Sequence, residues 1–209
     1  MSETKDKSVQ LFLDELASKN ATPGGGSVAA LMGAQSAALI SMVCNLTIGK
    51  PNYEEVDAQM RTLLGQSEML REHLTSMVKA DIDVFNRLMS AYSSPKETDE
   101  EKALRSELIQ SILKDATEVP LACAKACKEL IALSQVAANL GNLGVISDAG
   151  VAVIAASSGL KSAALNVYVN TGCLKDTDYA ATKITELEAI LAGTDTSVEE
   201  IYQLVKTKL

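Results

Sequence analysis

Two long stretches with almost no charge constrain the fold of this chain more than any other feature. Residues 21–49 contain no Asp, Glu, Lys or Arg, and residues 149–174 contain only Lys161. In the first stretch small residues recur at every fourth position, as at Ala29 and Gly33, and this spacing lets helix backbones approach closely. Because a helix without a charged face belongs in an interior, we expect two helices buried at the centre of a bundle.

A membrane span is the alternative for residues 21–49, which are long enough to cross a bilayer. Polar side chains such as Gln35 and Asn45 dilute their apolar character, and Ala and Gly outnumber Leu. We therefore favour a buried helix and expect no membrane association. A helix buried on all sides in so small a protein also points to an oligomer, because one layer of neighbouring helices does not cover it.

The remaining segments also have helical patterns. Strand-like alternation of Val, Ile and Thr is absent, and capping boxes are indicated at 98–101 and at 196–199. We expect an all-α fold: one domain over residues 1–209, a helical bundle with two largely uncharged buried helices and one long helix over residues 54–92. The expected helices cover residues 8–19, 27–48, 54–92, 98–119, 121–140, 147–169, 177–192 and 197–208.

The charge balance and the rare residue types exclude several classes of function. Lys and Arg number 19 and Asp and Glu number 27, so the formal net charge of −8 argues against nucleic acid or an anionic membrane as a partner. Two Phe and no Trp leave no platform for stacking bases. Because His73 is the single histidine, one chain cannot form a metal site with two His ligands.

The N-terminus and the cysteines point to the cytoplasm. Residues 1–7 are charged and polar, with no apolar signal-peptide core behind them. The cysteines have no CxxC spacing, and we expect small buried thiols in a reducing compartment. The four are Cys44, Cys123, Cys127 and Cys173.

One acidic residue lies on the apolar side of the long helix. The apolar stripe passes through Met77 and Phe85 with Asp81 between them at four-residue spacing, whereas Asp83 points roughly the opposite way. A carboxylate turned inward is costly unless it is hydrogen-bonded, paired or used in function. We infer that Asp81 suits a cationic substrate; the alternative is a buried Asp that caps a neighbouring helix.

A glycine turn precedes the first uncharged helix. It consists of Gly24, Gly25 and Gly26, followed by Ser27, which we expect to be the N-cap. Free N–H groups at this helix end favour anionic or carbonyl oxygens, and a flexible turn without a ligand is the alternative. The segment lacks the Gly-Lys-Ser/Thr ending of a phosphate-binding loop, and no strand precedes it for a dinucleotide fold.

Other polar residues near helix ends are weaker candidates. Asn166 and Asn170 share one face of the second uncharged helix, where they either bond each other or a neighbouring helix, or contact the amide-like edges of a heterocycle. Asn142 and Asp148 belong to the polar turn before that helix. Lys50 follows the first uncharged helix and either lies on the surface or meets a substrate carboxylate.

Five segments spread in order over nearly the whole chain carry a shared pattern. They are 22–27 (TPGGGS), 41–50 (SMVCNLTIGK), 81–85 (DIDVF), 141–152 (GNLGVISDAGVA) and 162–170 (SAALNVYVN). Together they resemble the cyclodeaminase/cyclohydrolase family of folate enzymes, and the last segment looks more like its stand-alone cyclohydrolase branch. In two departures, Pro51 and Asn52 stand where the family often has two lysines, and Gly144 stands where many members have Asn.

The resemblance implies an all-α homodimer that hydrolyses 5,10-methenyltetrahydrofolate to 10-formyltetrahydrofolate without a metal or nicotinamide. Asp81 would be the general base beside the substrate cation, and Asp148 would orient water or contact the pterin. Asn142, Asn166 and Asn170 would hydrogen-bond the pterin edges, and the glycine turn would line the pocket. Formiminotetrahydrofolate cyclodeaminase and a non-catalytic folate-binding protein are the alternative functions.

Overall fold

The computed structural model describes residues 6–209, and this part of the chain contains seven α-helices and no strand. The all-α expectation is therefore confirmed, while residues 1–5 of the polar N-terminus lie outside the described range. Short 3-10 helices, η2 (Glu54–Val56) and η3 (Leu143–Val145), precede the third and fifth α-helices. The α-helices are α1 (Val9–Leu16), α2 (Gly25–Asn45), α3 (Asp57–Tyr92), α4 (Asp99–Leu140), α5 (Ile146–Gly172), α6 (Thr177–Leu191) and α7 (Thr194–Thr207).

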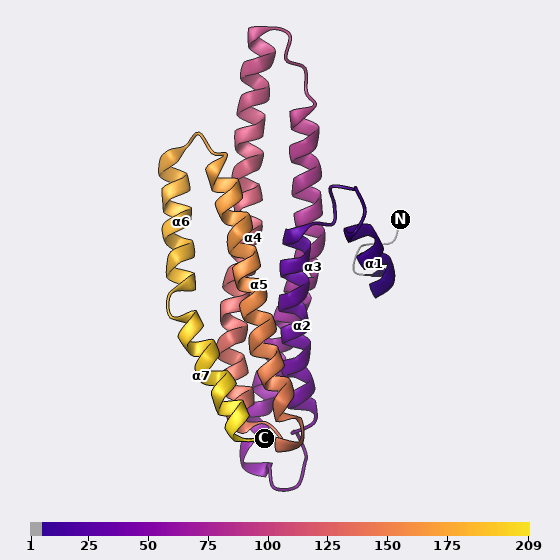
Figure 1. Ribbon diagram of the computed structural model, residues 1–209, viewed down its shortest axis with the longest axis vertical. Coiled ribbons are helices and arrows are strands. Elements are labelled where there is room, and N and C mark those ends of the chain that lie inside the picture. The colour runs from indigo at the N-terminus through magenta and orange to yellow at the C-terminus, as the bar shows by residue number, and fades with distance from the viewer. Residues whose placement is uncertain (1–5) are drawn as a thin grey trace.

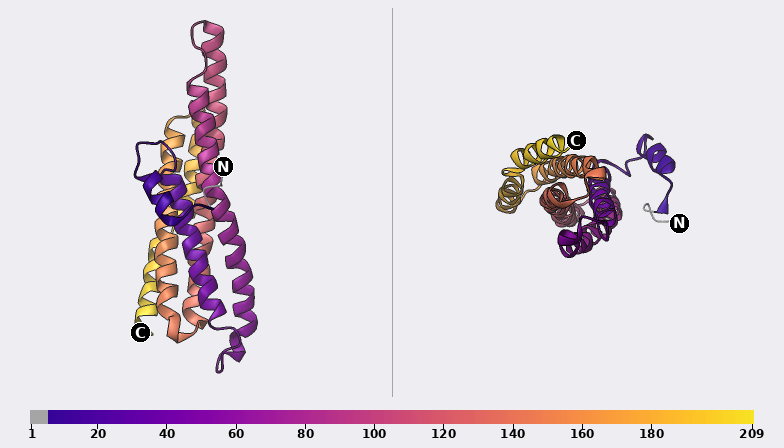
Figure 2. Two further views of the ribbon diagram at one scale, coloured as in Figure 1. Left: turned by 90° about the vertical axis from the view of Figure 1, so that its right-hand side faces the viewer. Right: turned by 90° about the horizontal axis from the view of Figure 1, so that it is seen from below.

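Four helices, α2 to α5, run side by side along the long axis, and α6 and α7 pack against α4 and α5 (Figure 1). The two longest, α3 with 36 residues and α4 with 42, extend past the ends of α2 and α5 as a projecting hairpin. Helix α1 stands clear of the bundle beside α2, as both further views show (Figure 2). The expected long helix is confirmed, although its first turn is η2.

Local sequence patterns predict some of the helix N-termini correctly and others wrongly. The capping box of Thr98 and Glu101 is present, with both hydrogen bonds formed. The predicted N-cap at Ser27 is wrong, because α2 begins after Gly24 and the Ser27 hydroxyl bonds a distant helix instead. The second predicted capping box, at 196–199, is also wrong: α7 begins at Thr194, after Gly193 turns the chain in a left-handed conformation with φ of 76°.

The two uncharged helices pack closely against each other through small residues. A side chain added at Gly159 would lie 3.0 Å from the Ala29 carbonyl oxygen and 3.2 Å from the Gly33 nitrogen, so α5 meets the backbone of α2 directly. Within one chain each of these helices still leaves one face exposed. That face includes Met42 on α2 and Ile154 on α5, which are 37% and 45% exposed.

Both uncharged helices are long and apolar enough to cross a membrane by length and composition alone. In the most apolar segment of α2, 61% is buried within the protein, as expected for a core helix. In the corresponding segment of η3 and α5, 44% is buried. Such segments also occur in the core helices of soluble proteins, so they are weak indications of a membrane span.

The interior consists of two apolar clusters that meet along α3 and α4. The larger cluster surrounds α2 and α5 and includes Met77 and Val78 of α3. The smaller lies mainly between the two helices of the hairpin, where it includes Val84 and Leu88, and it is completed by Leu174 and Ala180 from the α5–α6 segment. Asp81 therefore lies at the boundary between two apolar clusters, where α3 passes the start of α2.

Candidate active site

Asp81 reaches across from α3 to the first turn of α2. The Ser27 hydroxyl donates a hydrogen bond of 2.8 Å to Asp81 Oδ2, and the Ser27 backbone N–H donates to the same carboxylate. The first N–H groups of a helix have no partner within that helix, so Asp81 caps α2 from outside. The capping role, considered above as an alternative to function, is therefore present in the structure.

The glycine turn permits this contact. A Cβ atom at Gly26 would lie 2.1 Å from Asp81 Oδ1, a distance that no side chain could tolerate without displacing the carboxylate. At Gly25 the nearest atom to an added Cβ would be Asn166 Nδ2, at 3.8 Å. The structure thus brings together the glycine turn, Ser27, Asp81 and Asn166, four parts of the predicted site.

Burial raises the pKa of Asp81 above its ordinary value, and the two hydrogen bonds from Ser27 oppose that rise. A carboxylate with a raised pKa holds a proton more readily than one in water, which suits a group that accepts a proton during a reaction. As a whole residue Asp81 is half-buried.

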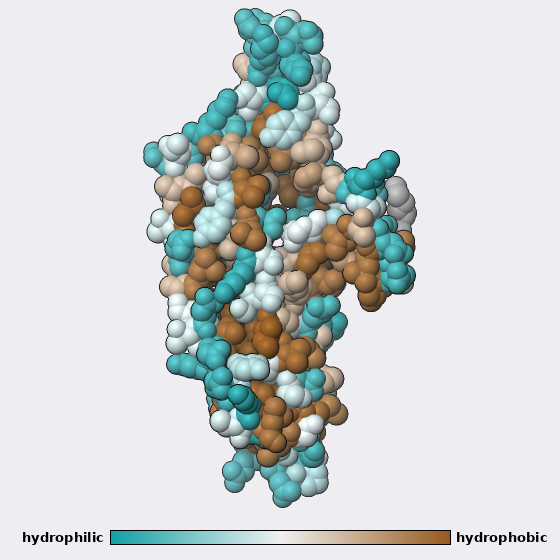
Figure 3. Space-filling model, in the orientation of Figure 1, coloured by the Kyte–Doolittle hydropathy of each residue, from teal (hydrophilic) through white to brown (hydrophobic). Residues whose placement is uncertain are grey.

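A narrow cavity with room for about one water molecule lies beside Asp81. Asp81 is the only charged residue among the described residues that line it. Besides Asp81 and Gly26, the wall comes from α2 to α5 through Ala29, Ala30, Met77, Val119, Pro120, Cys123 and Ala163. Sequence reasoning missed the contribution of α4, although a proline within an otherwise continuous helical pattern was a usable signal. Outside this cavity, the surface is hollowed between α5 and the hairpin, above the start of α2 (Figure 3).

The two predicted asparagines on α5 lie on the side of this site but bond protein carbonyls. Asn170 Nδ2 donates 2.6 Å to the Ala116 carbonyl oxygen, which has no helical donor because Pro120 lacks an N–H group. Asn166 Nδ2 donates 2.9 Å to the Ser162 carbonyl oxygen one turn earlier. The side-chain oxygens of both residues have no intramolecular bond recorded among residues 6–209, so they remain available as acceptors.

Three predicted site residues lie at the opposite end of the bundle. Asn142 is buried, donating 2.8 Å to the Leu46 carbonyl oxygen and accepting from the Gly144 N–H at 2.9 Å. Asp148 lies in the first turn of α5, and Lys50 is exposed just beyond α2. Because α2 has 21 residues, this end is roughly 30 Å from Asp81, and one chain does not place these residues beside it.

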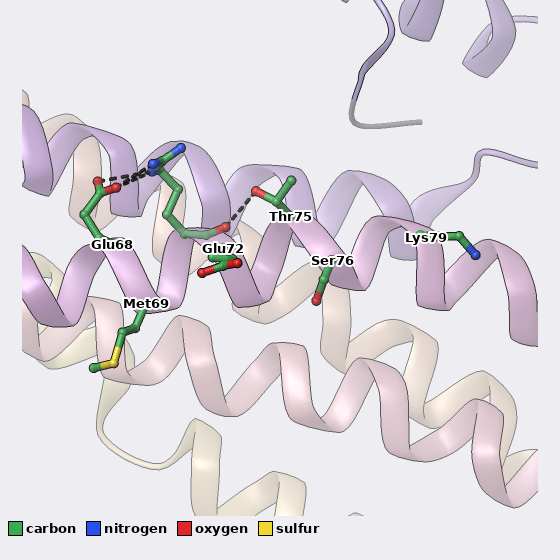
Figure 4. Close-up of a pocket in the computed structure, with 7 residues that line it drawn as sticks. Glu68, Met69, Glu72, Thr75, Ser76 and Lys79 are labelled. Carbon is green, nitrogen blue, oxygen red and sulfur yellow. Dashed lines mark hydrogen bonds and ion pairs between the residues drawn. The ribbon is translucent and has the colours of Figure 1, made fainter. Parts of the chain in front are cut away.

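A separate surface depression lies along the outer side of α3 (Figure 4). Its described wall includes Glu68 and Arg71, which form an ion pair, and Thr75, which bonds the Arg71 carbonyl oxygen. Exposed pairs of this kind contribute little to stability, and no predicted site residue lies there. Within residues 6–209, no group of three His, Cys, Asp or Glu side chains is placed to hold a metal ion.

The family pattern of formiminotransferase-cyclodeaminase matches residues 8–189 of this chain. The chain belongs to the formiminotransferase-cyclodeaminase family. Methenyltetrahydrofolate cyclohydrolase from Methylorubrum extorquens is 53% identical to it over 98% of both chains. The resemblance inferred from the five segments is therefore confirmed.

Members with the cyclodeaminase name are more distant. Formimidoyltransferase-cyclodeaminase from Rattus norvegicus is 39% identical over 82% of this chain, which corresponds to 31% of the rat protein. The crystal structure of formiminotetrahydrofolate cyclodeaminase from Thermotoga maritima has 30% identity and a TM-score of 0.83, covering 99% of this chain and 98% of that one. The fold and the family are shared across both named activities.

Proposed function

We propose that this protein is a methenyltetrahydrofolate cyclohydrolase of one-carbon metabolism, which converts 5,10-methenyltetrahydrofolate and water into 10-formyltetrahydrofolate and a proton. The observation that carries the proposal is a single carboxylate, Asp81, facing a cavity of about one water molecule at the boundary of the two apolar clusters. The relative with this name, identical at 53% of positions over the full length, supports the same reaction.

The chemistry requires little from the protein because the substrate carries its own positive charge. The bridging carbon of the amidinium cation is already electrophilic, so a positioned water and a base suffice. In the proposed reaction Asp81 stabilises the cation and takes one proton from water as the C–O bond forms. The second water proton then passes from the new hydroxyl group toward N5 as the C–N5 bond breaks, which leaves the formyl group on N10.

The remaining predicted residues have narrower roles in this proposal. The side-chain oxygens of Asn166 and Asn170 accept hydrogen bonds from the pterin, and Gly25 and Gly26 line its path. Ser27 positions Asp81 rather than binding substrate, because its hydroxyl is fully buried against that carboxylate. No metal or cofactor is proposed.

Asp81→Asn tests the base assignment. We expect turnover to fall by about 10²–10⁴-fold, the range typical of general acid–base catalysis, with the fold preserved. Wild-type turnover in a folded Asp81→Asn protein would exclude Asp81 as the base. The control is Asp83→Asn, which changes an exposed carboxylate two residues away that is paired with Lys79.

Formiminotetrahydrofolate cyclodeaminase is the second candidate, favoured by the shared fold of the Thermotoga maritima protein. That reaction forms the methenyl compound and releases ammonia, whereas the cyclohydrolase consumes it. An assay that supplies each folate separately and follows methenyl absorbance distinguishes the two. Tight folate binding without turnover of either compound would instead indicate a non-catalytic folate-binding protein.

We further propose that the enzyme is a homodimer in the cytoplasm, as the family resemblance implies. Exposed apolar side chains on α2 and α5 support an oligomer. Light scattering during size-exclusion chromatography measures the mass directly, and cell fractionation measures the location.

A further inference from the structure

The cavity beside Asp81 has a second polar side chain in its wall, the thiol of Cys123. Cys123 belongs to α4, less than one turn after Pro120, and only 3% of it is exposed. The other described side chains of the wall are those of Ala, Val, Pro and Met, which donate no hydrogen bond. With Asp81 ionised, Cys123 is therefore the one described side chain in the wall that can donate a hydrogen bond into the cavity.

A second thiol on the same face of α4 orients the first. Cys127 follows Cys123 at four-residue spacing, and the two side chains share a hydrogen bond. This bond and burial raise the pKa of Cys127, which therefore stays a protonated thiol that can donate to Cys123 Sγ. Cys127 is itself closely packed, since a Cβ atom added at Gly33 or Gly159 would lie 2.9 or 3.0 Å from its sulfur. The S–H group of Cys123 is then left to point toward the cavity.

Water and ammonia fit this pair of groups differently. Either molecule is small enough for the cavity, and either can donate one hydrogen to the Asp81 carboxylate. Water has two lone pairs, so it can accept a hydrogen bond from the Cys123 S–H group and still attack the substrate with the other pair. Ammonia has one lone pair, which the attack consumes, so the S–H group would lose its acceptor. A buried donor without a partner is unfavourable, and such a loss discriminates strongly between similar molecules.

From this geometry we infer that Cys123 determines the choice of nucleophile: it holds water in the cavity beside Asp81 and disfavours ammonia. The inference rests on the proposed function and adds what separates the cyclohydrolase reaction from the cyclodeaminase reaction on one fold. Cys123 contacts the attacking molecule and not the folate, so we describe it as a specificity-determining residue.

The two nucleophiles give different products from the same cation. Water gives the formyl compound and one proton, by the steps described above. With ammonia, a C–N bond would form at the bridging carbon and the C–N10 bond would break. Ammonia would lose two protons, one to N10 and one through Asp81 to solvent, which gives formiminotetrahydrofolate. The ratio of the two products therefore measures the choice of nucleophile directly.

Cys123→Ala and Cys123→Ser test the inference as a pair, because they leave similar space and differ in the hydrogen-bond donor. Each protein receives the methenyl compound with isotopically labelled ammonium at one pH, and mass spectrometry measures formyl and formimino products above the reaction without enzyme. We expect the formyl-to-formimino ratio to fall about fivefold in Cys123→Ala, the worth of one hydrogen bond, and to return to near the wild-type value in Cys123→Ser. Cys44→Ala, which removes another fully buried thiol outside the cavity wall, should leave the ratio unchanged.

The outcomes separate the inference from the proposed function. If the wild type hydrolyses the methenyl compound but a folded Cys123→Ala protein keeps the wild-type ratio, the proposed function stands and the inference fails. An equal fall in Cys123→Ala and Cys123→Ser would also overturn the inference, because the donor would then not matter. A wild-type protein that favours ammonia over water, or that turns over neither folate, would overturn both.

Discussion

At the scale of single residues, the Ser27 hydroxyl opposes the effect of burial on Asp81. Ser27→Ala removes a donor to the ionised carboxylate, so the pKa of Asp81 should rise further. A general base must be ionised, and the acidic limb of the kcat/KM profile should therefore move to higher pH. Ser134→Ala, which removes another fully buried hydroxyl on α4, should leave that limb in place. An unmoved limb in Ser27→Ala would mean that the hydroxyl does not act on the base.

The raised pKa of Asp81 also has a consequence for stability. The folded state holds the Asp81 proton at a pH where the unfolded chain has released it, so this group favours folding at low pH and that contribution is lost as the pH rises through the folded pKa. Asp81→Asn should therefore unfold at a higher temperature than wild type at pH 7 while losing activity. The difference should shrink toward pH 4, near the ordinary pKa of 3.8, and a variant less stable at pH 7 would contradict this account.

Gly26 and Gly65 form a matched pair of helical glycines. Gly26→Ala would force its Cβ against Asp81, and a displacement of about 1 Å can cost on the order of 10²-fold in rate. Gly65 has open space around an added Cβ, so Gly65→Ala should raise the free energy of unfolding by about 0.5–1 kcal/mol with unchanged activity. Steady-state kinetics and thermal unfolding of both variants test the contrast, which fails if Gly26→Ala turns over normally.

At the scale of helices, Asn170 and Pro120 are coupled through one carbonyl group. Pro120 leaves the Ala116 carbonyl oxygen without its helical donor, and Asn170 of α5 bonds it instead. Asn170→Leu should therefore lower the free energy of unfolding by about 1–3 kcal/mol. In a Pro120→Ala background the restored N–H group satisfies the same oxygen, so the same substitution should cost less. A double-mutant cycle measures this coupling, and additive effects would show that the carbonyl does not link the two residues.

Helix identity and helix boundaries differ in how far the sequence determines them. The apolar periodicity of α3 and the capping box of Thr98 depend on residues close in the chain, and both were predicted correctly. The start of α2 was not, because the Ser27 hydroxyl bonds Asp81, 54 positions away. Asn142 likewise bonds Leu46, 96 positions away, and no local pattern contains that partner.

At the scale of the whole molecule, the family pattern identified more candidate residues than one chain brings together. The glycine turn, Asp81 and Asn166 meet at one end, whereas Asp148 and Lys50 lie at the other. Spacing along the sequence predicts which residues share a helix face, but not which ends of antiparallel helices are adjacent. Pro120 marks an unusual position of α4 in the sequence, but its place in the wall beside Asp81 depends on how the helices pack.

The division of the interior into two apolar clusters has a consequence for motion. The smaller cluster lies beyond the start of α2 and holds fewer buried residues than the larger one, so α3 and α4 can separate there without unfolding the larger cluster, although they must then lose their contacts with Leu174 and Ala180. Amide hydrogen exchange should therefore be faster around Leu88 and Ile109 than around Leu74 and Leu130. Asp81 lies between the region of fast amide exchange and the region of slow amide exchange. A bound folate that contacts both regions would slow amide exchange in the hairpin. Opening of the hairpin would then expose one edge of the site, and we expect it to control the rate of product release.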